Sequence, residues 1–308
     1  GCASRACRSR PSRSSTGRPG TEPPAGGRVD TPLIDAPALL TSLGLHGELQ
    51  PLTGGYWNAV FRVGGDRVAK VYGAEPPLTM FPILPADEAR ALEVLAGARV
   101  APAFIAFHPA DGERPAVLVY EWVEGAQWET GTAQIGALFR RQHAVAAEGF
   151  REVPTDAAGI LAQGDPMAEG CDALLALRPP ATAGPSARRV LLHTDAGTGN
   201  FIVGDDGPRL IDWQCPALGD AAEDLFTFLS PAFQVLYGHE PLTADERAAF
   251  LEAYDDAAVT ARLAELEPAL TYRMGAYCAM RERALAESDP AASARYARAL
   301  ALSLDALR

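Results

Sequence analysis

Residues 193–213 read HTDAGTGNFIVGDDGPRLIDW, a polar loop followed by two short apolar runs. The runs NFIV and RLID are separated by Gly-Asp-Asp-Gly at 204–207, a composition typical of a tight turn, so they predict a β-hairpin. The two aspartates of this turn look like metal ligands in isolation, but turn chemistry is the better interpretation. Asp195 and Asn200 precede the hairpin and Asp212 follows it, so a tight hairpin brings these three side chains to one edge.

The oxygen atoms of these three side chains predict a metal site beside a proton acceptor. Carboxylate and amide oxygens suit a hard cation such as Mg²⁺, which keeps several waters and takes few protein ligands. A second carboxylate beside that site, not consumed by the metal, can accept or orient a hydroxyl proton. An alternative is a metal-dependent hydrolase that uses His193 and Asp195 as ligands, which requires the imidazole to point at the metal.

The spacing H-x-D-x-x-x-x-N, followed by a hydrophobic-Asp-aromatic triplet, is the catalytic pattern of the protein-kinase-like phosphotransferases. In detail, HTDAGTGN, LIDW and GDAAEDL resemble the motifs of the aminoglycoside phosphotransferase and choline kinase family. The resemblance covers about residues 45–230 through motifs, and the last 75 or so residues match only as a helical tail. It implies an ATP-dependent phosphotransferase with Asp195 as the catalytic carboxylate and Mg²⁺ on Asn200 and Asp212. Ala196 and Gln214 depart from the residues frequent in the family, near the expected acceptor site.

The resemblance also requires a lysine on the third strand, to hold the phosphates of the nucleotide. Lys70, in DRVAKVYG (66–73), is the only lysine among 27 basic residues. Lysine is a compact charge on a flexible stem and arginine is a broad planar fork, so a chain rich in arginine should retain lysine where arginine cannot serve. A carboxylate on the following helix should pair with Lys70. Glu88 is preferred because it lies in the first helical turn, and Glu93 is the alternative.

Further nucleotide contacts follow from the same resemblance. Gly54 and Gly55 lie where the family has its phosphate-covering turn, and their backbone amides can approach phosphate oxygens without a β-carbon in the way. The backbone of Glu121 and Val123, in LVYEWVEG, is expected at the adenine edge. Because backbone atoms read the base, this segment does not distinguish ATP from GTP. His143 is expected to be structural.

The expected acceptor is a small molecule with a hydroxyl group: an aminoglycoside, an amino alcohol such as choline, or a sugar-like compound. Many of these are cationic, in keeping with a net charge of −12. Candidate acceptor contacts are Trp213, Glu223, Tyr254 and Tyr272, because paired aromatic rings can surround a quaternary amine. A place in the core is the better interpretation for most of these side chains, so no acceptor residue is assigned. Two alternatives stay open: a nucleotide-binding pseudoenzyme that acts as a sensor or scaffold, and a protein serine/threonine kinase, although H-R-D and A-P-E motifs are absent.

The order of the expected elements indicates an α+β, bilobal protein-kinase-like fold. Strand candidates are ELQPL, NAVFRV, DRVAKVY, AFIAFH and AVLVYEWV, with a helix in ADEARALEVLAGA between the third and the fourth. Helix candidates further on are TAQIGALFRRQHAVAA and TADERAAFLEAY, the second with a capping box of Thr243 and Glu246. We expect a disordered tail rich in Arg, Ser, Pro and Gly over 1–34, a small nucleotide-binding lobe with an antiparallel sheet and one helix over 35–124, and a larger, mainly helical lobe with the catalytic loop and acceptor site over 125–308.

The composition excludes several other classes of protein. Of the 308 residues, 48% are hydrophobic and 21% are charged, which is ordinary for a globular chain. The acidic balance argues against a nucleic-acid partner, and no apolar run is long enough to span a bilayer. The five cysteines form no C-x-x-C pair, so we expect neither a zinc site nor disulfides, and a cytoplasmic location fits best.

Overall fold

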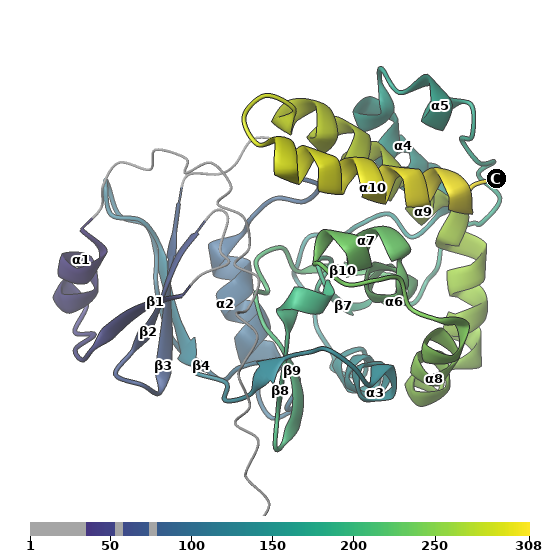
Figure 1. Ribbon diagram of the computed structural model, residues 1–308. Coiled ribbons are helices and arrows are strands. Elements are labelled where there is room, and N and C mark those ends of the chain that lie inside the picture. The colour runs from purple at the N-terminus through teal and green to yellow at the C-terminus, as the bar shows by residue number, and fades with distance from the viewer. Residues whose placement is uncertain (1–34, 53–57, 74–78) are drawn as a thin grey trace, which may run out of the picture.

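The computed structural model describes residues 35–52, 58–73 and 79–308. The expected tail over 1–34 therefore lies outside the described residues. The N-terminal part of the described chain forms a five-stranded antiparallel sheet with the strand order β1-β2-β3-β5-β4 (Figure 1). Its elements match the strands and the inserted helix predicted from the sequence, preceded by a short helix α1. They are α1 (Ala36–Ser42), β1 (Leu49–Leu52), β2 (Asn58–Val63), β3 (Arg67–Tyr72), α2 (Pro85–Val94), β4 (Phe104–His108) and β5 (Val117–Glu121).

Strand β3 is buried on both faces of this sheet. Because side chains alternate along a strand, Ala69 and Val71 pack toward α1 on one face. Val68 and Tyr72 pack on the other face, in the large hydrophobic core that includes α2. Lys70 lies between them in the same alternation, so the backbone directs its charged side chain toward the interior of the molecule.

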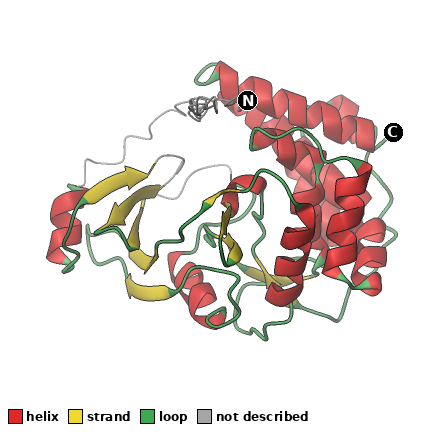
Figure 2. Cartoon of the chain, turned by 60° about the horizontal axis from the view of Figure 1, so that its bottom comes forward, coloured by secondary structure: helices red, strands yellow, loops and turns green. Residues whose placement is uncertain are grey.

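The rest of the described chain is mainly helical, which confirms the α+β, bilobal protein-kinase-like prediction (Figures 1 and 2). Helix α9 packs against both α4 and α10, and α3 packs against α8. The capping box predicted at the start of α8 is present, formed by Thr243 and Glu246. The helices are α3 (Thr132–Gln142), α4 (Ala157–Ala168), α5 (Asp172–Leu175), α6 (Ala222–Leu229), α7 (Pro231–Leu236), α8 (Ala244–Tyr254), α9 (Ala257–Leu285) and α10 (Pro290–Ala306).

Short strands interrupt these helices and carry the polar loop. Strand β7 (Val190–Leu192) pairs with β10 (Ala217–Gly219), and β8 (Phe201–Gly204) forms the predicted hairpin with β9 (Gly207–Leu210), flanked by β6 (Ala126–Gln127). A 3-10 turn, η1 (Thr198–Asn200), leads into β8. Asp205 and Asp206 lie exposed at the tip of the hairpin, which confirms their interpretation as turn residues.

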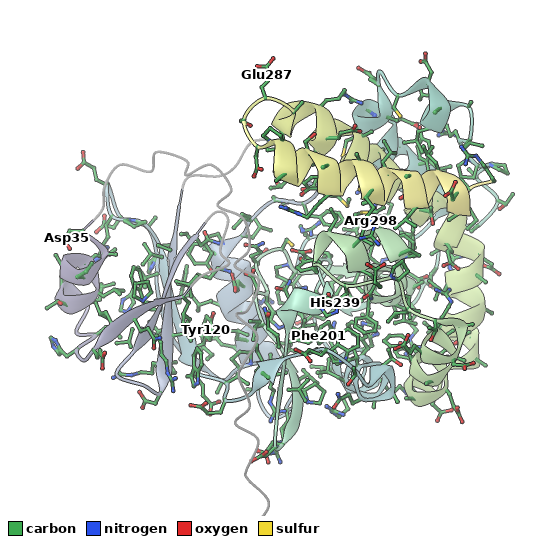
Figure 3. All side chains as sticks on the ribbon, in the orientation of Figure 1. Asp35, Tyr120, Phe201, His239, Glu287 and Arg298 are labelled. Atoms are coloured by element: carbon green, nitrogen blue, oxygen red, sulfur yellow. The ribbon has the colours of Figure 1, made fainter. Side chains whose placement is uncertain are left out.

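Backbone hydrogen bonds join the segment around α2 to the hairpin. Leu84 N–H, just before α2, donates to the carbonyl of Gln214 at 2.8 Å. Leu210 N–H donates to the carbonyl of Val100, also at 2.8 Å. Side chains fill the space between the sheet and the helical lobe, with Tyr120 on the sheet side and Phe201 on the other (Figure 3). The division into lobes at 124/125 stays a prediction. Within the described ranges, no helix combines the length and apolar character needed to cross a bilayer.

Candidate active site

Lys70 and Glu88 form a buried ion pair between strand β3 and helix α2. Lys70 Nζ donates to Glu88 Oε1 at 3.0 Å and to Oε2 at 2.7 Å. The hydroxyl of Tyr72, two residues along the strand on the same face, donates to Glu88 Oε2 at 2.5 Å. Glu93, the alternative partner, is exposed on the far side of the helix. The sequence did not indicate the contribution of Tyr72.

The same lysine reaches the hairpin of the helical lobe. Lys70 Nζ donates to Asp212 Oδ1, so one ammonium group bridges the carboxylates of Glu88 and Asp212. Burial alone would lower the pKa of Lys70, but the charges of Asp212 and Glu88 outweigh burial and raise it above its ordinary value. Lys70 is therefore a permanent cation beside the polar loop, 142 positions before its partner Asp212 in the chain.

Asp195 and Asn200 lie on the loop next to Asp212. Asn200 Nδ2 donates to the main-chain carbonyl of Asp195 at 2.8 Å. Ile211 N–H donates to the carbonyl of Asn200 at 2.8 Å, which holds the start of β8 against the end of β9. Burial and the neighbouring Asp212 raise the pKa of Asp195 to about 7, against smaller opposing effects of Tyr237 and Lys70. A carboxyl group with such a pKa suits proton transfer near neutral pH.

The backbone of the polar loop is strained at Thr194 and Asp212, and Asp224 holds the segment that contains Thr194. Thr194 and Asp212 have φ of 66° and 64°, values that are rare for residues other than glycine. The buried carboxylate of Asp224, on α6, accepts hydrogen bonds from the N–H groups of His193 and Thr194, both at 2.9 Å. Asp224 belongs to the quoted motif GDAAEDL, but sequence reasoning gave it no role. An acidic residue inside the apolar run of α6 is the signal that could have found it.

His193 is not a metal ligand in this structure, so the metal-dependent hydrolase alternative is wrong. Its Nδ1 accepts from Asp195 N–H at 3.2 Å, and its Nε2 lies 3.0 Å from the carbonyl of Ile211, which only an N–H can satisfy. Both ring nitrogens are therefore engaged with the backbone. His143 is likewise structural, because it lies buried between Tyr254 and Asp224.

The end of β5 and the segment after it carry the two residues predicted at the adenine edge, Glu121 and Val123. The side chain of Glu121 is exposed, and Trp122 N–H donates to the carbonyl of Asp66 at 2.9 Å. Val123 N–H has no hydrogen-bond partner among residues 35–52, 58–73 and 79–308. Gly54 and Gly55, predicted to contact phosphate, lie outside the described residues.

The four candidate acceptor contacts belong to the core, which is the interpretation that the sequence favoured for most of them. Trp213, Tyr254 and Tyr272 are fully buried, and Trp213 Nε1 donates to the carbonyl of Leu210 at 2.8 Å. Glu223 is buried too and forms an ion pair with Arg273.

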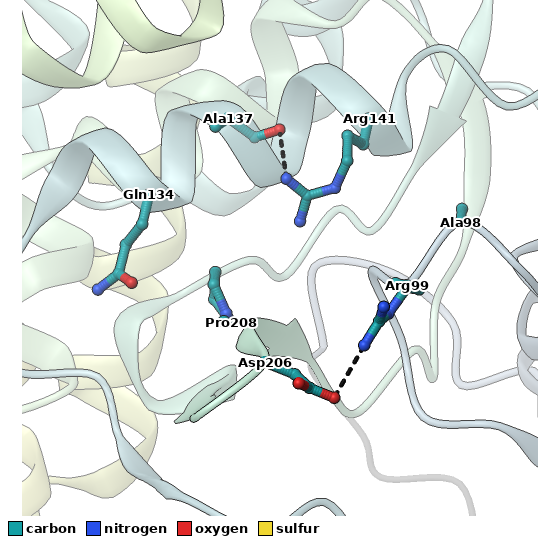
Figure 4. Close-up of a pocket in the computed structure, with 8 residues that line it drawn as sticks. Ala98, Arg99, Gln134, Ala137, Arg141, Asp206 and Pro208 are labelled. Atoms are coloured by element: carbon teal, nitrogen blue, oxygen red, sulfur yellow. Dashed lines mark hydrogen bonds and ion pairs between the residues drawn. The ribbon is translucent and has the colours of Figure 1, made fainter.

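The hollow drawn in Figure 4 lies on the outer side of the hairpin. Arg99 pairs across it with Asp206 at 2.8 Å, and Arg141 extends from α3. It contains none of Lys70, Asp195 or Asp212. This surface is therefore separate from the polar loop.

The residues of the loop fit a magnesium ion by the chemistry of their donors. Asn200 directs its Nδ2 to the backbone of Asp195, so its Oδ1 is free to act as a ligand oxygen. Asp212 adds a carboxylate that remains partly exposed. No cluster of three His, Cys, Asp or Glu side chains that could hold a metal occurs in the described part of the chain. A site with few protein ligands and several waters is what Mg²⁺ prefers.

Comparisons with known proteins agree with this arrangement. A family model described as "Phosphotransferase enzyme family" matches residues 48–266, most of the chain. A choline/ethanolamine kinase family protein from Mesorhizobium loti shares the fold with a TM-score of 0.60 and 22% identity, over 89% of this chain and 98% of that one. The GDP complex of aminoglycoside 2'-phosphotransferase-IIIa gives a TM-score of 0.63 at 13% identity, over 88% and 97%.

A third similar structure is the amicoumacin kinase hAmiN with AMP-PNP, Ca²⁺ and Ami, with a TM-score of 0.59 and 15% identity over 89% of this chain and 94% of that one. A sequence comparison with curated proteins finds no match for the chain. The resemblance read from HTDAGTGN and LIDW is confirmed by the family model and by these folds. The chain belongs to the phosphotransferase enzyme family.

Proposed function

We propose that this protein is an ATP-dependent phosphotransferase that phosphorylates a hydroxyl group of a small molecule. The observation that carries the proposal is the contact of Lys70, from the small-lobe sheet, with Asp212, at the end of the hairpin that also holds Asn200 beside Asp195. A buried cation and convergent oxygen ligands beside a carboxylate with a raised pKa are the groups that phosphoryl transfer uses.

Each group has one part in this proposal. Lys70, oriented by Glu88, holds phosphate oxygens of the nucleotide, and Asn200 and Asp212 hold Mg²⁺. The metal ion, when bound, supplies positive charge that offsets the charge of the phosphates. The amides of Gly54 and Gly55 cover the phosphates, as the family resemblance implies.

The nucleotide base is expected at the segment after β5. The Val123 N–H and the carbonyl of Glu121 would meet the adenine edge, and the side chains of this segment do not choose between ATP and GTP. The similar structures include a GDP complex and an AMP-PNP complex, which supports a nucleotide donor without choosing between the bases.

Asp195 acts on the acceptor. It orients the acceptor hydroxyl and takes its proton as the hydroxyl oxygen bonds to the γ-phosphorus. The bond from that phosphorus to the bridging oxygen breaks, and the nucleotide diphosphate leaves. Little covalent chemistry falls to the protein, so catalysis comes from positioning and charge stabilisation.

The acceptor class proposed is an aminoglycoside, an amino alcohol or a sugar-like alcohol. The similar structures include a choline/ethanolamine kinase family protein and an aminoglycoside phosphotransferase, which supports this range. The net charge of −12 favours a cationic acceptor through long-range attraction. We place the protein in the cytoplasm, where ATP and such metabolites are available.

The test is a screen of ATP consumption over aminoglycosides, amino alcohols and sugars, with Asp195→Asn as the blank. We expect one class to stimulate wild-type turnover, and Asp195→Asn and Asp212→Asn each to lower it at least ~100-fold, the scale of losing one such group. Wild-type turnover in Asp195→Asn would rule out the mechanism. Tight nucleotide binding with no turnover across the panel would instead identify a pseudoenzyme, and phosphorylation of protein substrates alone would identify a protein kinase.

A further inference from the structure

Tyr237, the residue after helix α7, reaches the carboxylate of Asp195 from the helical lobe. Its hydroxyl donates a hydrogen bond to Asp195 Oδ1 at 3.0 Å. Burial, followed by the charge of Asp195, raises the pKa of the Tyr237 phenol well above its ordinary value. The phenol therefore stays protonated and is the donor in this bond.

The ring of Tyr237 lies directly on the loop backbone, where two glycines leave room for it. A Cβ atom at Gly197 would lie 2.0 Å from Cε2 of the ring, and one at Gly199 would lie 2.6 Å from Cδ1. Gly197 has φ of −72°, which any residue adopts, so close approach rather than backbone freedom requires glycine there. The loop sequence AGTGN is thus shaped to the ring of Tyr237.

The other contacts of Asp195 fix its backbone and leave its carboxylate to Tyr237. Asn200 holds the carbonyl of Asp195, and His193 accepts from its N–H. Within residues 35–52, 58–73 and 79–308, the hydroxyl of Tyr237 is the only hydrogen-bond donor to the carboxylate oxygens. Rotation of the carboxylate about its side-chain bonds is therefore restrained by this one bond.

We propose that Tyr237 is the positioning residue of Asp195, holding Oδ1 so that Oδ2 faces the acceptor hydroxyl. The inference rests on the proposed function, because it takes Asp195 as the group that receives the acceptor proton. A catalytic group must be held close to its productive orientation, and a displacement of 1 Å costs on the order of 100-fold in rate. The glycines of the loop are part of the same arrangement, since they determine where the ring lies.

Two substitutions test the contact between Tyr237 and Asp195 in different ways. Tyr237→Phe keeps the ring and removes the donor, whereas Gly197→Ala keeps the donor and displaces the ring. Each has a matched control in the same lobe. Tyr272→Phe removes a bond of the same kind, from Tyr272 to Asp165 Oδ1 at 3.1 Å, and Gly184→Ala adds a Cβ where no atom lies within 4 Å.

The first measurement is release of inorganic phosphate from Mg²⁺·ATP with water as the acceptor, which requires no identified substrate. We expect Tyr237→Phe and Gly197→Ala to lower kcat ~10-fold or more, with KM for ATP unchanged, because orientation of the base is lost while the nucleotide site is intact. Tyr272→Phe and Gly184→Ala should retain wild-type kcat. Equal kcat in Tyr237→Phe and Tyr272→Phe would overturn the inference, and a KM that rises with the fall in kcat would indicate a general structural defect instead.

Asp195→Asn separates this inference from the proposed function. If Asp195→Asn releases phosphate at the wild-type rate, the proposed function fails. If Asp195→Asn is impaired and Tyr237→Phe is not, the positioning role alone fails. The second measurement is independent of turnover: crystal structures of the wild type and of Tyr237→Phe. A rotated or disordered Asp195 carboxylate in Tyr237→Phe would support the inference, and an unchanged carboxylate would overturn it.

Discussion

Glu88→Gln should destabilise the small lobe and weaken nucleotide binding, whereas Glu93→Gln should do neither. The two glutamates lie on the same helix, but Glu88 is buried against Lys70 and Tyr72, and Glu93 is exposed. The substitution keeps the volume of the side chain and removes its charge. Lys70 then loses one of its two carboxylate partners and retains Asp212.

The magnitude follows from the contacts of the Glu88 carboxylate. It accepts two hydrogen bonds from Lys70, at 3.0 and 2.7 Å, and one from Tyr72 at 2.5 Å. Breaking a buried ion pair by removing one partner costs about 3–5 kcal/mol. Because the amide oxygen of glutamine can still accept and Lys70 keeps Asp212, we expect the lower end, ~3 kcal/mol. Exposed Glu93 should contribute within ~0.5 kcal/mol.

Urea unfolding followed by tryptophan fluorescence measures the stability, and the KM for ATP measures the nucleotide site. A loss of ~3 kcal/mol moves the unfolding midpoint down by ~1 M or more for a slope of 1–3 kcal/mol/M. We also expect a higher KM for ATP, because Lys70 without the Glu88 carboxylate is drawn further toward Asp212. Equal midpoints for Glu88→Gln and Glu93→Gln would refute the assignment of the buried pair.

Three other outcomes are expected. Burial and Asp212 raise the pKa of Asp195 to about 7, and Asp195 must be ionised to accept a proton. The value of kcat/KM should therefore rise tenfold per pH unit below about pH 7 and level off above it. A pH profile that is flat down to pH 5 would contradict this. Although burial opposes the shift, hydrogen bonding holds the pKa of Asp224 below its ordinary value. The stability that the Asp224 carboxylate contributes is therefore present above an unfolded pKa of about 3.9 and is lost as the pH falls below that value. Asp224→Asn should be less stable than wild type at pH 7 and lose less stability on acidification, as measured by urea unfolding between pH 3 and 7. Gly136→Ala should destabilise the lobe by ~1–3 kcal/mol, because its Cβ would lie 2.2 Å from the carbonyl oxygen of Phe250; a thermal midpoint equal to that of wild type would show that α3 and α8 can move apart freely.

Local signals in the sequence predicted the fold well. The short apolar runs predicted as strands became β1, β2 and β3, and the Thr243–Glu246 pair marks the start of α8 because a capping box depends only on neighbouring residues. The spacing of Asp195, Asn200 and Asp212 was informative for the same reason. A hairpin is a local structure, so the positions of its polar residues follow from their distance along the chain.

Contacts between distant segments could not be predicted in this way. Tyr237 lies 42 positions from Asp195, and no periodicity or motif connects them. The sequence left Trp213 and Tyr254 open between the core and an acceptor site, with the core preferred, because large aromatic rings stabilise a core as readily as they line a site. Both are fully buried. What decides between these uses is which helices pack over the loop, and α7, α9 and α10 carry no sequence pattern that fixes that packing.

The contacts of Lys70 explain why this arginine-rich chain has a lysine at position 70. An ammonium group has three donors, and Lys70 directs them to three oxygens: both of Glu88 and one of Asp212. A guanidinium group in the same buried space would spread five donors over a rigid plane and would point some of them away from these closely spaced oxygens. Unpaired buried donors cost about 1–3 kcal/mol each, so arginine is disfavoured at this position even before its greater bulk is considered. The chain has 26 arginines and retains its only lysine where three carboxylate oxygens surround a single point.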